Sequence, residues 1–343
     1  NNGETKYTAV DGTPSLKNAI IEKFKRENNI IYSADQISVG TGGKQIIFNA
    51  LLASVDPGDE VIIPAPYWVS YPDIVAFAGG KSIFVECDEN SNFKITAEQL
   101  SQNINEKTKW VILNSPSNPT GICYSEAELF EISKVIESNS HVNVMTDDIY
   151  EHLVYDGFIF KTISEVNPNI KDQTLIINGV SKAYAMTGWR IGYAAGEKKL
   201  IKAMGKLQSQ STSNPSSISQ AAAVEALSGD QNFLKSRAEV FKKRRDFVVN
   251  SLNKIDGITC IKPEGAFYVF PNCTGLIGKK TKNGKALNND EDIVTALLEE
   301  AGVAVVQGSA FGLQGYFRIS YATSDELLSS ACERISNFCS ELV

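Results

Sequence analysis

The sequence predicts an α/β fold with a mostly parallel central sheet covered by helices, and with a smaller α+β domain. Short apolar runs alternate with amphipathic stretches through the first two thirds of the chain. Several of these runs lack the alternation of a half-exposed strand, which is typical of strands buried on both faces, and helical segments lie between many of them. The 343 residues, 43% of them hydrophobic, can fill one large core or two ordinary ones.

The expected strands of the larger domain are apolar and short. One ends in Val39-Gly40, before a glycine turn and a helix, and the others cover residues 60–63, 82–85, 110–113, 142–145 and 175–177. The first domain is predicted over residues 1–250 as a large α/β unit.

A long amphipathic helix is expected from about Gln231 to Lys254, because apolar pairs recur there every seven residues. The basic run 242–245 is placed on its solvated face. Beyond it, residues 266–270 suit a strand, residues 279–289 a polar loop, and residues 293–306 a helix followed by a strand. These elements predict a small α+β domain over residues 251–343. The sequence opens at Asn1 without an initiator methionine, so we expect an N-terminal part of the small domain to precede it.

Composition argues against several classes of protein. Lys and Arg number 33 and Asp and Glu 40, a net charge of −7, and no basic block suits nucleic acid or anionic lipid. The six cysteines are dispersed without a CxxC pair, which suits buried free thiols in a reducing compartment. Without a membrane-spanning run or signal peptide, we expect a soluble cytoplasmic protein. Two histidines, His141 and His152, give little support to a zinc site or a histidine triad.

A glycine turn at Gly40-Thr41-Gly42-Gly43-Lys44 joins an expected strand to an expected helix. Free N–H groups at such a helix start favour a phosphate, although a purely structural turn fits equally well. The nicotinamide pattern GxGxxG fails because Gln45 stands at its last position, and the Walker pattern also fails.

Three further segments place polar groups after apolar strands, where α/β proteins bind ligands. Asn118 lies in Asn114–Gly121, and Asp147, Asp148 and Tyr150 follow the run 142–145. Helix capping is an alternative role for either aspartate. Lys182 stands in an otherwise uncharged stretch, where partial desolvation would lower its pKa and free the amine to attack a carbonyl. A surface lysine is the alternative.

Taken together, these segments resemble the class I aminotransferases of fold type I, which use pyridoxal 5′-phosphate (PLP), and in particular the bacterial-type aspartate aminotransferases. The resemblance runs from Tyr7 to Thr323. It rests on ordered motifs at family-like spacings: Pro66–Tyr71, Asn118–Gly121, Asp147–Tyr150, Ser181-Lys182 and Gly188–Gly192.

The resemblance implies a role for each candidate residue at PLP. Lys182 is similar to the lysine that holds PLP and then moves the substrate Cα proton, and Asp147 to the carboxylate that keeps the ring nitrogen protonated, with Asp148 pointing elsewhere. The resemblance also implies that Asn118 and Tyr150 contact the 3′ oxygen of PLP and that Trp68 stacks on the ring face. Arg190, Gly42, Gly43 and Lys44 would hold the phosphate, and Tyr7 would reach the phosphate of the neighbouring subunit. A homodimer with shared active sites follows.

The substrate contacts implied by the resemblance are Arg318 for the α-carboxylate, with Trp68 and Asn118 beside it, and Lys44 for a distal carboxylate. For Arg318, the alternative is a charge on the surface of a strand. For Lys44, the alternative is a cap of the phosphate loop that faces solvent. Residues 208–215 hold no arginine of the animal-type branch, and Gly179 replaces a common serine phosphate ligand. Relatives also suggest cis peptides at Ala65-Pro66 and Asn118-Pro119.

The activity that the resemblance implies is aspartate:2-oxoglutarate aminotransfer by a ping-pong cycle, from amino-acid and 2-oxo-acid substrates. A prephenate or aromatic aminotransferase is the nearest alternative. A transcription regulator on the PLP fold, with a DNA-binding module before Asn1, and a PLP-dependent lyase are alternatives from other classes.

Overall fold

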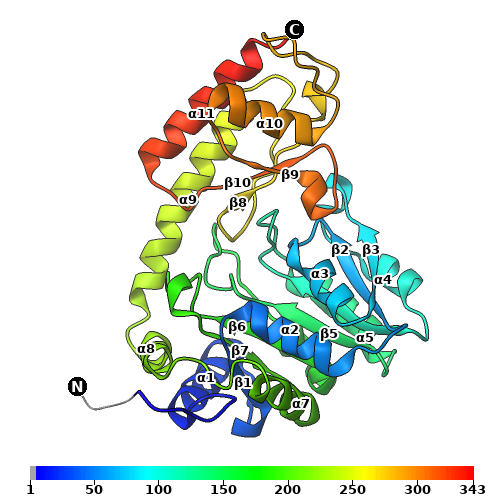
Figure 1. Cartoon of the computed structure of the whole chain (residues 1–343), viewed down its shortest axis with the longest axis vertical. Helices are drawn as coiled ribbons and strands as arrows, with labels where there is room; N and C mark the ends of the chain where they lie inside the picture. Colours follow the sequence, from blue (N-terminus) through cyan, green and yellow to red (C-terminus); the bar gives the residue numbers. More distant parts are fainter. Residues whose placement is uncertain (1–4) are drawn as a thin grey trace.

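Residues 5–343 are described by a computed structural model of the chain (Figure 1). Its larger sheet has the strand order β1-β7-β6-β5-β4-β2-β3. The strands are β1 (Ile37–Gly40), β2 (Glu60–Ala65), β3 (Lys81–Glu86), β4 (Thr108–Asn114), β5 (Asn143–Asp147), β6 (Thr174–Gly179) and β7 (Gly192–Ala195). Only β7 runs antiparallel to its neighbours β1 and β6 among these strands. The predicted mostly parallel α/β sheet is confirmed.

Helices cover both faces of this sheet. On one face, alternate strand residues such as Val61 and Ile112 pack against α2 (Gly43–Ser54), α3 (Ser70–Phe77) and α7 (Lys198–Ser209). On the other, residues such as Val111 and Tyr193 pack against α1 (Pro14–Asn28), α4 (Ala97–Asn103), α5 (Glu126–Glu137), α6 (Ile163–Val166) and α8 (Ser217–Ser228). The edge strand β3 is an exception to burial on both faces, because Phe84 is 50% exposed.

A second, antiparallel sheet has the order β8-β10-β9. Its strands are β8 (Tyr268–Val269), β9 (Val306–Gln307) and β10 (Phe317–Ser320), so the strand expected over residues 266–270 is shorter than predicted. Its core includes apolar side chains of α9 (Asn232–Leu252), α10 (Asp290–Ala301) and α11 (Asp325–Ser340). In Figure 1, α9 runs along one side of the molecule from the larger sheet toward these helices.

The long helix α9 confirms the seven-residue pattern but corrects one of its assignments. Arg245, expected on the solvated face, is completely buried. Its guanidinium forms ion pairs with Asp156 at 2.7 Å and Asp246 at 2.8 Å, and it donates to the carbonyl of Pro263. A buried charge is retained where partners of this kind surround it. Among residues 5–343, no helix combines the length and the apolarity needed to cross a bilayer.

Register brings the ends of the large sheet's strands to one edge. Asn114 at the end of β4 pairs with Asp147 at the end of β5, and Asp147 pairs with Ile177 of β6. Gly179 pairs with Gly192, which pairs in turn with Gly40 at the end of β1. The loops that carry the candidate residues therefore leave the sheet side by side.

Candidate active site

A cavity of about 360 Å³ lies at this edge and also includes side chains from the smaller sheet. Tyr268 of β8 and Arg318 of β10 line it, together with the loops that follow β4, β5 and β6. Nine of the candidate residues predicted from the sequence share this lining: Gly43, Lys44, Trp68, Asn118, Asp147, Tyr150, Lys182, Arg190 and Arg318. Gly42 lies next to the guanidinium of Arg190. Tyr7 is 90% exposed and does not line the cavity.

Lys182 follows β6 and is half-buried. Its Nζ lies 5.5 Å from the ring centre of Tyr150 and 5.6 Å from that of Phe267, and none of the described carboxylates lies within ion-pair distance. Burial lowers the pKa of the amine, and the positive charges of Arg318 and Arg190 lower it further, whereas the charge of Asp147 opposes both effects. The amine is therefore easier to deprotonate than that of a surface lysine.

Asp147 ends β5 with its carboxylate in the cavity wall. The hydroxyl of Tyr71 donates to its Oδ2 at 2.8 Å, and the backbone N–H of Ile149 donates to Oδ1 at 3.4 Å. Burial raises the pKa of Asp147 to about 6, although these two hydrogen bonds and the charge of Lys182 oppose the rise. A cation placed beside this carboxylate would hold it ionised.

Asp148 is outside the cavity lining, as expected from the sequence. Its Oδ1 accepts a hydrogen bond of 2.6 Å from the hydroxyl of Thr146. Burial raises the pKa of Asp148 to about 7. The two neighbouring carboxylates thus lie in different surroundings.

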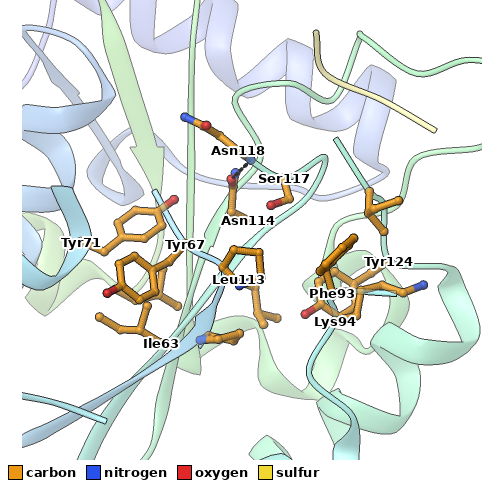
Figure 2. A pocket seen from close by; sticks show the side chains of 14 residues that line it. Ile63, Tyr67, Tyr71, Phe93, Lys94, Leu113, Asn114, Ser117, Asn118 and Tyr124 are labelled. Carbon is orange, nitrogen blue, oxygen red and sulfur yellow. Dashed lines mark hydrogen bonds between the residues drawn. The ribbon is translucent and has the colours of Figure 1, made fainter. Parts of the chain in front are cut away.

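A chain of hydrogen bonds crosses from the smaller sheet to β5. Arg318 Nη1 donates to Asn118 Oδ1 at 2.9 Å, the N–H of Asn118 donates to Asn114 Oδ1 at 2.7 Å, and Asn114 Nδ2 donates to the carbonyl of Asp147 at 2.7 Å. Figure 2 shows the lining of a neighbouring pocket, in which Tyr71, Asn114 and Asn118 are labelled. These three side chains line both that pocket and the cavity. The positions of Asn118 and Asp147 are therefore coupled through the side chain of Asn114.

Arg318 has an unused donor. Its guanidinium lies 4.7 Å from the ring centre of Tyr268 and 4.9 Å from that of Phe311, which orients it as cation–π contacts do. Its Nε is buried and has no hydrogen-bond partner within residues 5–343. A buried donor without an acceptor is costly, so this atom favours an incoming anion.

Glycines bring the loop before α2 close to β7. Gly42 has a φ of +87°, and a Cβ there would lie 2.2 Å from Arg190 Nη2; a Cβ on Gly192 would lie 2.2 Å from the nitrogen of Gly43. Within residues 5–343, no side chain caps the start of α2. The arrangement brings the start of α2 close to the guanidinium of Arg190, which donates to the carbonyls of Thr187 and Thr41, and such a pairing of helix N–H groups with a guanidinium is typical of phosphate sites.

Lys44 lies with its Nζ 4.8 Å from the ring centre of Trp68. It is exposed in the single chain, so residues 5–343 of one chain do not shield its ammonium from water. Its direction toward Trp68 nevertheless keeps it in the cavity lining.

Of the two expected cis peptides, Ala65-Pro66 is confirmed and Asn118-Pro119 is wrong. The second cis bond lies three residues earlier in the same loop, at Ser115-Pro116. Pro116 and Pro119 both follow β4. Because X-Pro bonds prefer the trans form only slightly, the residue types alone do not indicate which of these two bonds is cis.

Among the lining residues without a role assigned from the sequence, three make side-chain hydrogen bonds in the site: Tyr71, Asn114 and Tyr268. Tyr71 and Asn114 lie inside motifs already singled out, so their place near the other candidates was the available signal. Tyr268 Oη lies 2.9 Å from Tyr150 Oη, a contact that depends on the smaller sheet and has no local sequence signal.

Comparison with known proteins gives the same picture along the whole chain. Residues 1–335 match the family model described as aminotransferase class I and II. The chain is 59% identical over 340 residues to an aspartate aminotransferase of Rhizobium meliloti (strain 1021), covering 99% of this chain and 83% of the relative. It is also 59% identical to an aspartate/prephenate aminotransferase of Cereibacter sphaeroides, covering 99% and 85%.

Solved structures agree with these matches. The aspartate aminotransferase of Rhizobium meliloti superposes with a TM-score of 0.98 at 59% identity, covering 99% of this chain and 85% of that one. The Thermus thermophilus aspartate aminotransferase with maleate gives a TM-score of 0.91 at 40% identity, covering 98% and 84%. With its fold, its cavity and these matches in agreement, the chain belongs to the class I and II aminotransferase family.

Proposed function

We propose that this protein is an aspartate:2-oxoglutarate aminotransferase that uses PLP. The observation that carries the proposal is the meeting, in one cavity, of the desolvated amine of Lys182, the buried carboxylate of Asp147 and the guanidinium of Arg318. The names of the relatives support aspartate as the substrate. Two half-reactions at this one site give ping-pong kinetics.

The residues present fit PLP. Gly43 and Lys44 at the start of α2 would provide N–H groups, and Arg190 a guanidinium, for the phosphate, and a Cβ at Gly42 or Gly192 would close this cradle. The N–H of Gly42, expected to join them, donates instead to the carbonyl of Gly40 at 2.9 Å. Asp147 would lie at the ring nitrogen, Trp68 at the ring face, and Asn118 and Tyr150 at the 3′ oxygen. When bound, PLP supplies an electron sink for the pair left by the broken Cα–H bond.

Lys182 moves the proton in this proposal. Its Nζ, with a pKa lowered by burial, takes the proton from the substrate Cα as general base and returns one as general acid. Asp147, beside a protonated ring nitrogen, stabilises the positive charge there. Its carboxylate is fixed for this task by the hydroxyl of Tyr71.

Arg318 binds the α-carboxylate of the amino acid or 2-oxo acid. The free Nε and the fixed plane of the guanidinium suit a bidentate pair, which a lysine cannot reproduce. Lys44 receives the second carboxylate of aspartate or 2-oxoglutarate. Trp68 and Asn118 line the space between these cations.

The assembly that we propose is a homodimer with shared active sites. Tyr7 is 90% exposed in the single chain, which suits a side chain that reaches the phosphate of the neighbouring subunit. Residues 1–250 form the PLP-binding domain and residues 251–343 the small domain that carries Arg318. The six cysteines are free and buried, which supports a cytoplasmic location.

Prephenate is a second candidate substrate. The relative of Cereibacter sphaeroides, which is as similar as the aspartate enzyme, is named for both substrates. Prephenate also carries two carboxylates, so Arg318 and Lys44 would serve it in the same way.

The test is a spectrum followed by a donor screen. Purified protein should absorb in the visible with PLP bound, and kcat/KM should be greatest for aspartate among aspartate, phenylalanine and alanine, with 2-oxoglutarate as acceptor. Prephenate is then compared with 2-oxoglutarate as acceptor. A protein that binds PLP but transfers no amino group from any of these donors would contradict the proposed reaction.

A further inference from the structure

The turn that follows β5 presents its side chains to two sides. Asp147 and Tyr150 line the cavity, whereas Asp148 and Glu151, one residue later in each case, are buried outside that lining. The turn is closed by the N–H of Glu151, which donates to the carbonyl of Asp148 at 2.9 Å, and the N–H of Asp148 donates to the carbonyl of Ile177 at 2.9 Å. Contacts made on the outer side therefore decide where Asp147 and Tyr150 point.

Glu151 is held on that outer side by three partners from two elements, α1 and β6. Its Oε1 forms an ion pair with Lys23 of α1 and accepts a hydrogen bond of 2.7 Å from Asn178 of β6. Its Oε2 accepts from Asn28 at the end of α1, at 3.2 Å. Lys23, which is completely buried, also donates to Asn28 Oδ1 at 2.8 Å. One carboxylate thus joins α1, β6 and the turn.

Lys23 acts as the cation of a small acidic cluster. Ligand atoms of Glu27, Glu151 and His152 lie within 4.8 Å of one another, a spacing that could hold a metal ion. Lys23 Nζ contacts Glu151 and lies 3.5 Å from Glu27, while His152 Nε2 lies 2.9 Å from Glu27. The Lys23 ammonium and the Arg26 guanidinium, which pairs with Glu27, already balance the charges of the two carboxylates, so we interpret the cluster as a structural joint.

On the cavity side, Tyr150 has few restraints of its own. Its hydroxyl has one hydrogen-bond partner within the described chain, Tyr268 Oη at 2.9 Å. Its ring meets those of Phe267 and Tyr268 edge to face, with centres 5.4 and 5.8 Å apart. These contacts come from the segment at β8, so the placement of Tyr150 relative to the larger sheet depends on the turn itself.

We propose that Lys23 and Glu151 are positioning residues for the amino transfer, and that their buried ion pair holds the turn so that Tyr150 reaches the cofactor 3′ oxygen. The inference rests on the proposed function of Tyr150. A buried ion pair is weak evidence for stability, because an apolar pair of the same size often stabilises a fold as well. A directional joint between three elements gives this pair a positional role that an apolar pair lacks.

The test compares holoenzymes by the pH midpoint of the visible absorbance of bound PLP. The double variant Lys23→Met/Glu151→Gln removes both charges but keeps side-chain length and one amide oxygen, which can accept from Asn28 or from Asn178. It should move the midpoint by about half a unit or more in the same direction as Tyr150→Phe, because the hydrogen bond to the 3′ oxygen weakens in both. Placed in the Tyr150→Phe background, the double change should move the midpoint no further.

Apart from Lys23 and Glu151, whose opposite charges are removed together, the charged and titratable groups around Tyr150 are unchanged in the double variant, which isolates the effect of the joint. They are Asp147, Lys182, Tyr268 and Arg318 on the cavity side, and Asp148, Glu27 and His152 on the outer side. Arg245→Met is the matched control, because Arg245 is also completely buried in ion pairs but lies on α9 outside the cavity lining. It should lower the thermal midpoint and leave the spectral midpoint unchanged.

The outcomes separate this inference from the role of Tyr150. If Tyr150→Phe moves the spectral midpoint and the double variant does not, or if their effects add, the positioning role is overturned. If Tyr150→Phe itself leaves the spectral midpoint unchanged, that result contradicts the proposed contact of Tyr150 with the cofactor 3′ oxygen. Should the double variant not fold, Asn28→Ala removes one donor to Glu151 and keeps both charges. A smaller shift in the same direction supports the inference, and no shift overturns it.

Discussion

Asp147 and Asp148 offer a matched pair of substitutions, because each removes one buried carboxylate at neighbouring positions. Burial raises the pKa of both, to about 6 and about 7. Asp147 faces the cavity and accepts from Tyr71, whereas Asp148 accepts from Thr146 outside the cavity. We predict that Asp147→Asn removes activity and that Asp148→Asn alters stability instead.

For Asp147→Asn, the loss follows from a broken charge pair. With PLP bound, the carboxylate would face a protonated ring nitrogen, and removing one partner of a buried charge pair costs ~2–5 kcal/mol. Since about 1.4 kcal/mol is a factor of ten in rate, kcat should fall on the order of a hundredfold or more. The amide oxygen can still accept from Tyr71, which limits any structural loss.

For Asp148→Asn, the change in stability follows from the raised pKa. Burial raises that pKa from 3.8 to about 7, so between these values the folded protein binds a proton that the unfolded chain has released. The contribution of Asp148 to stability is therefore most favourable below about pH 4, falls as the pH rises to about 7, and then stays level, with a penalty on the order of 4 kcal/mol. The asparagine removes this penalty, and its amide oxygen can still accept from Thr146.

The assays are kcat with aspartate and 2-oxoglutarate, and thermal unfolding of the PLP-free proteins at pH 4 and pH 8. Asp148→Asn should unfold at a higher temperature than the wild type at pH 8 and at nearly the same temperature at pH 4, with kcat within a few-fold. Equal losses of kcat in the two variants would refute the assignment of Asp147. A gain in unfolding temperature that is the same at both pH values would refute the argument from the pKa of Asp148.

Three further predictions concern Lys182, Lys44 and Gly192. Lys182→Ala should lose the visible band and the activity, and a borohydride-reducible adduct at another lysine in this variant would contradict the assignment. Lys44→Ser should lower kcat/KM for aspartate by about two- to fivefold and spare phenylalanine, a modest effect because Lys44 is exposed; equal losses would place Lys44 at the phosphate alone. Gly192→Ala should weaken PLP binding about tenfold in equilibrium dialysis, because overpacking of Cβ against Gly43 costs ~1–3 kcal/mol, while Gly188→Ala, which meets nothing within 4 Å, should bind normally.

Local patterns in the sequence were enough to predict the main fold. The strands β2, β4, β5 and β6 have continuous apolar runs because helices cover both faces, and α9 repeats its apolar pairs every seven residues. The antiparallel direction of β7 was not predicted, since it depends on how the loop after β6 returns. The burial of Arg245 was also missed, because Asp156 comes from a distant loop and leaves no mark on the helix sequence.

The candidate site was predictable to the extent that its chemistry follows strands. The carboxyl ends of β4, β5 and β6 bring Asn118, Asp147 and Lys182 to one cavity. Contacts across the two sheets were not predictable, as the pairing of Tyr150 with Tyr268 shows. The position of the second cis proline likewise depends on the geometry of the loop and not on the residue types within it.

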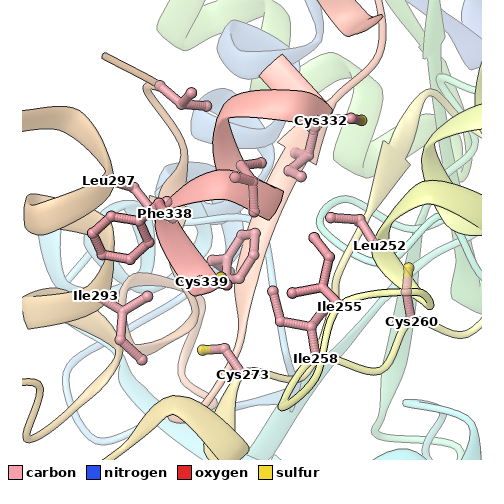
Figure 3. Packing of buried hydrophobic residues seen from close by; sticks show 14 of the residues in the cluster. Leu252, Ile255, Ile258, Cys260, Cys273, Ile293, Leu297, Cys332, Phe338 and Cys339 are labelled. Carbon is pink, nitrogen blue, oxygen red and sulfur yellow. The ribbon is translucent and has the colours of Figure 1, made fainter. Parts of the chain in front are cut away.

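The buried cysteines divide between the two parts of the molecule. Figure 3 shows Cys260, Cys273, Cys332 and Cys339 in the core that α9, α10 and α11 form, while Cys87 packs beneath the larger sheet and Cys123 lies in the loop after β4. Burial shields each thiol and raises its pKa, which disfavours the reactive thiolate. An alkylating reagent should therefore react slowly with these cysteines while the protein stays folded. The chain therefore carries a native set of footprinting probes. Pulse alkylation followed by peptide mass spectrometry can time the opening of each core separately, without any introduced label.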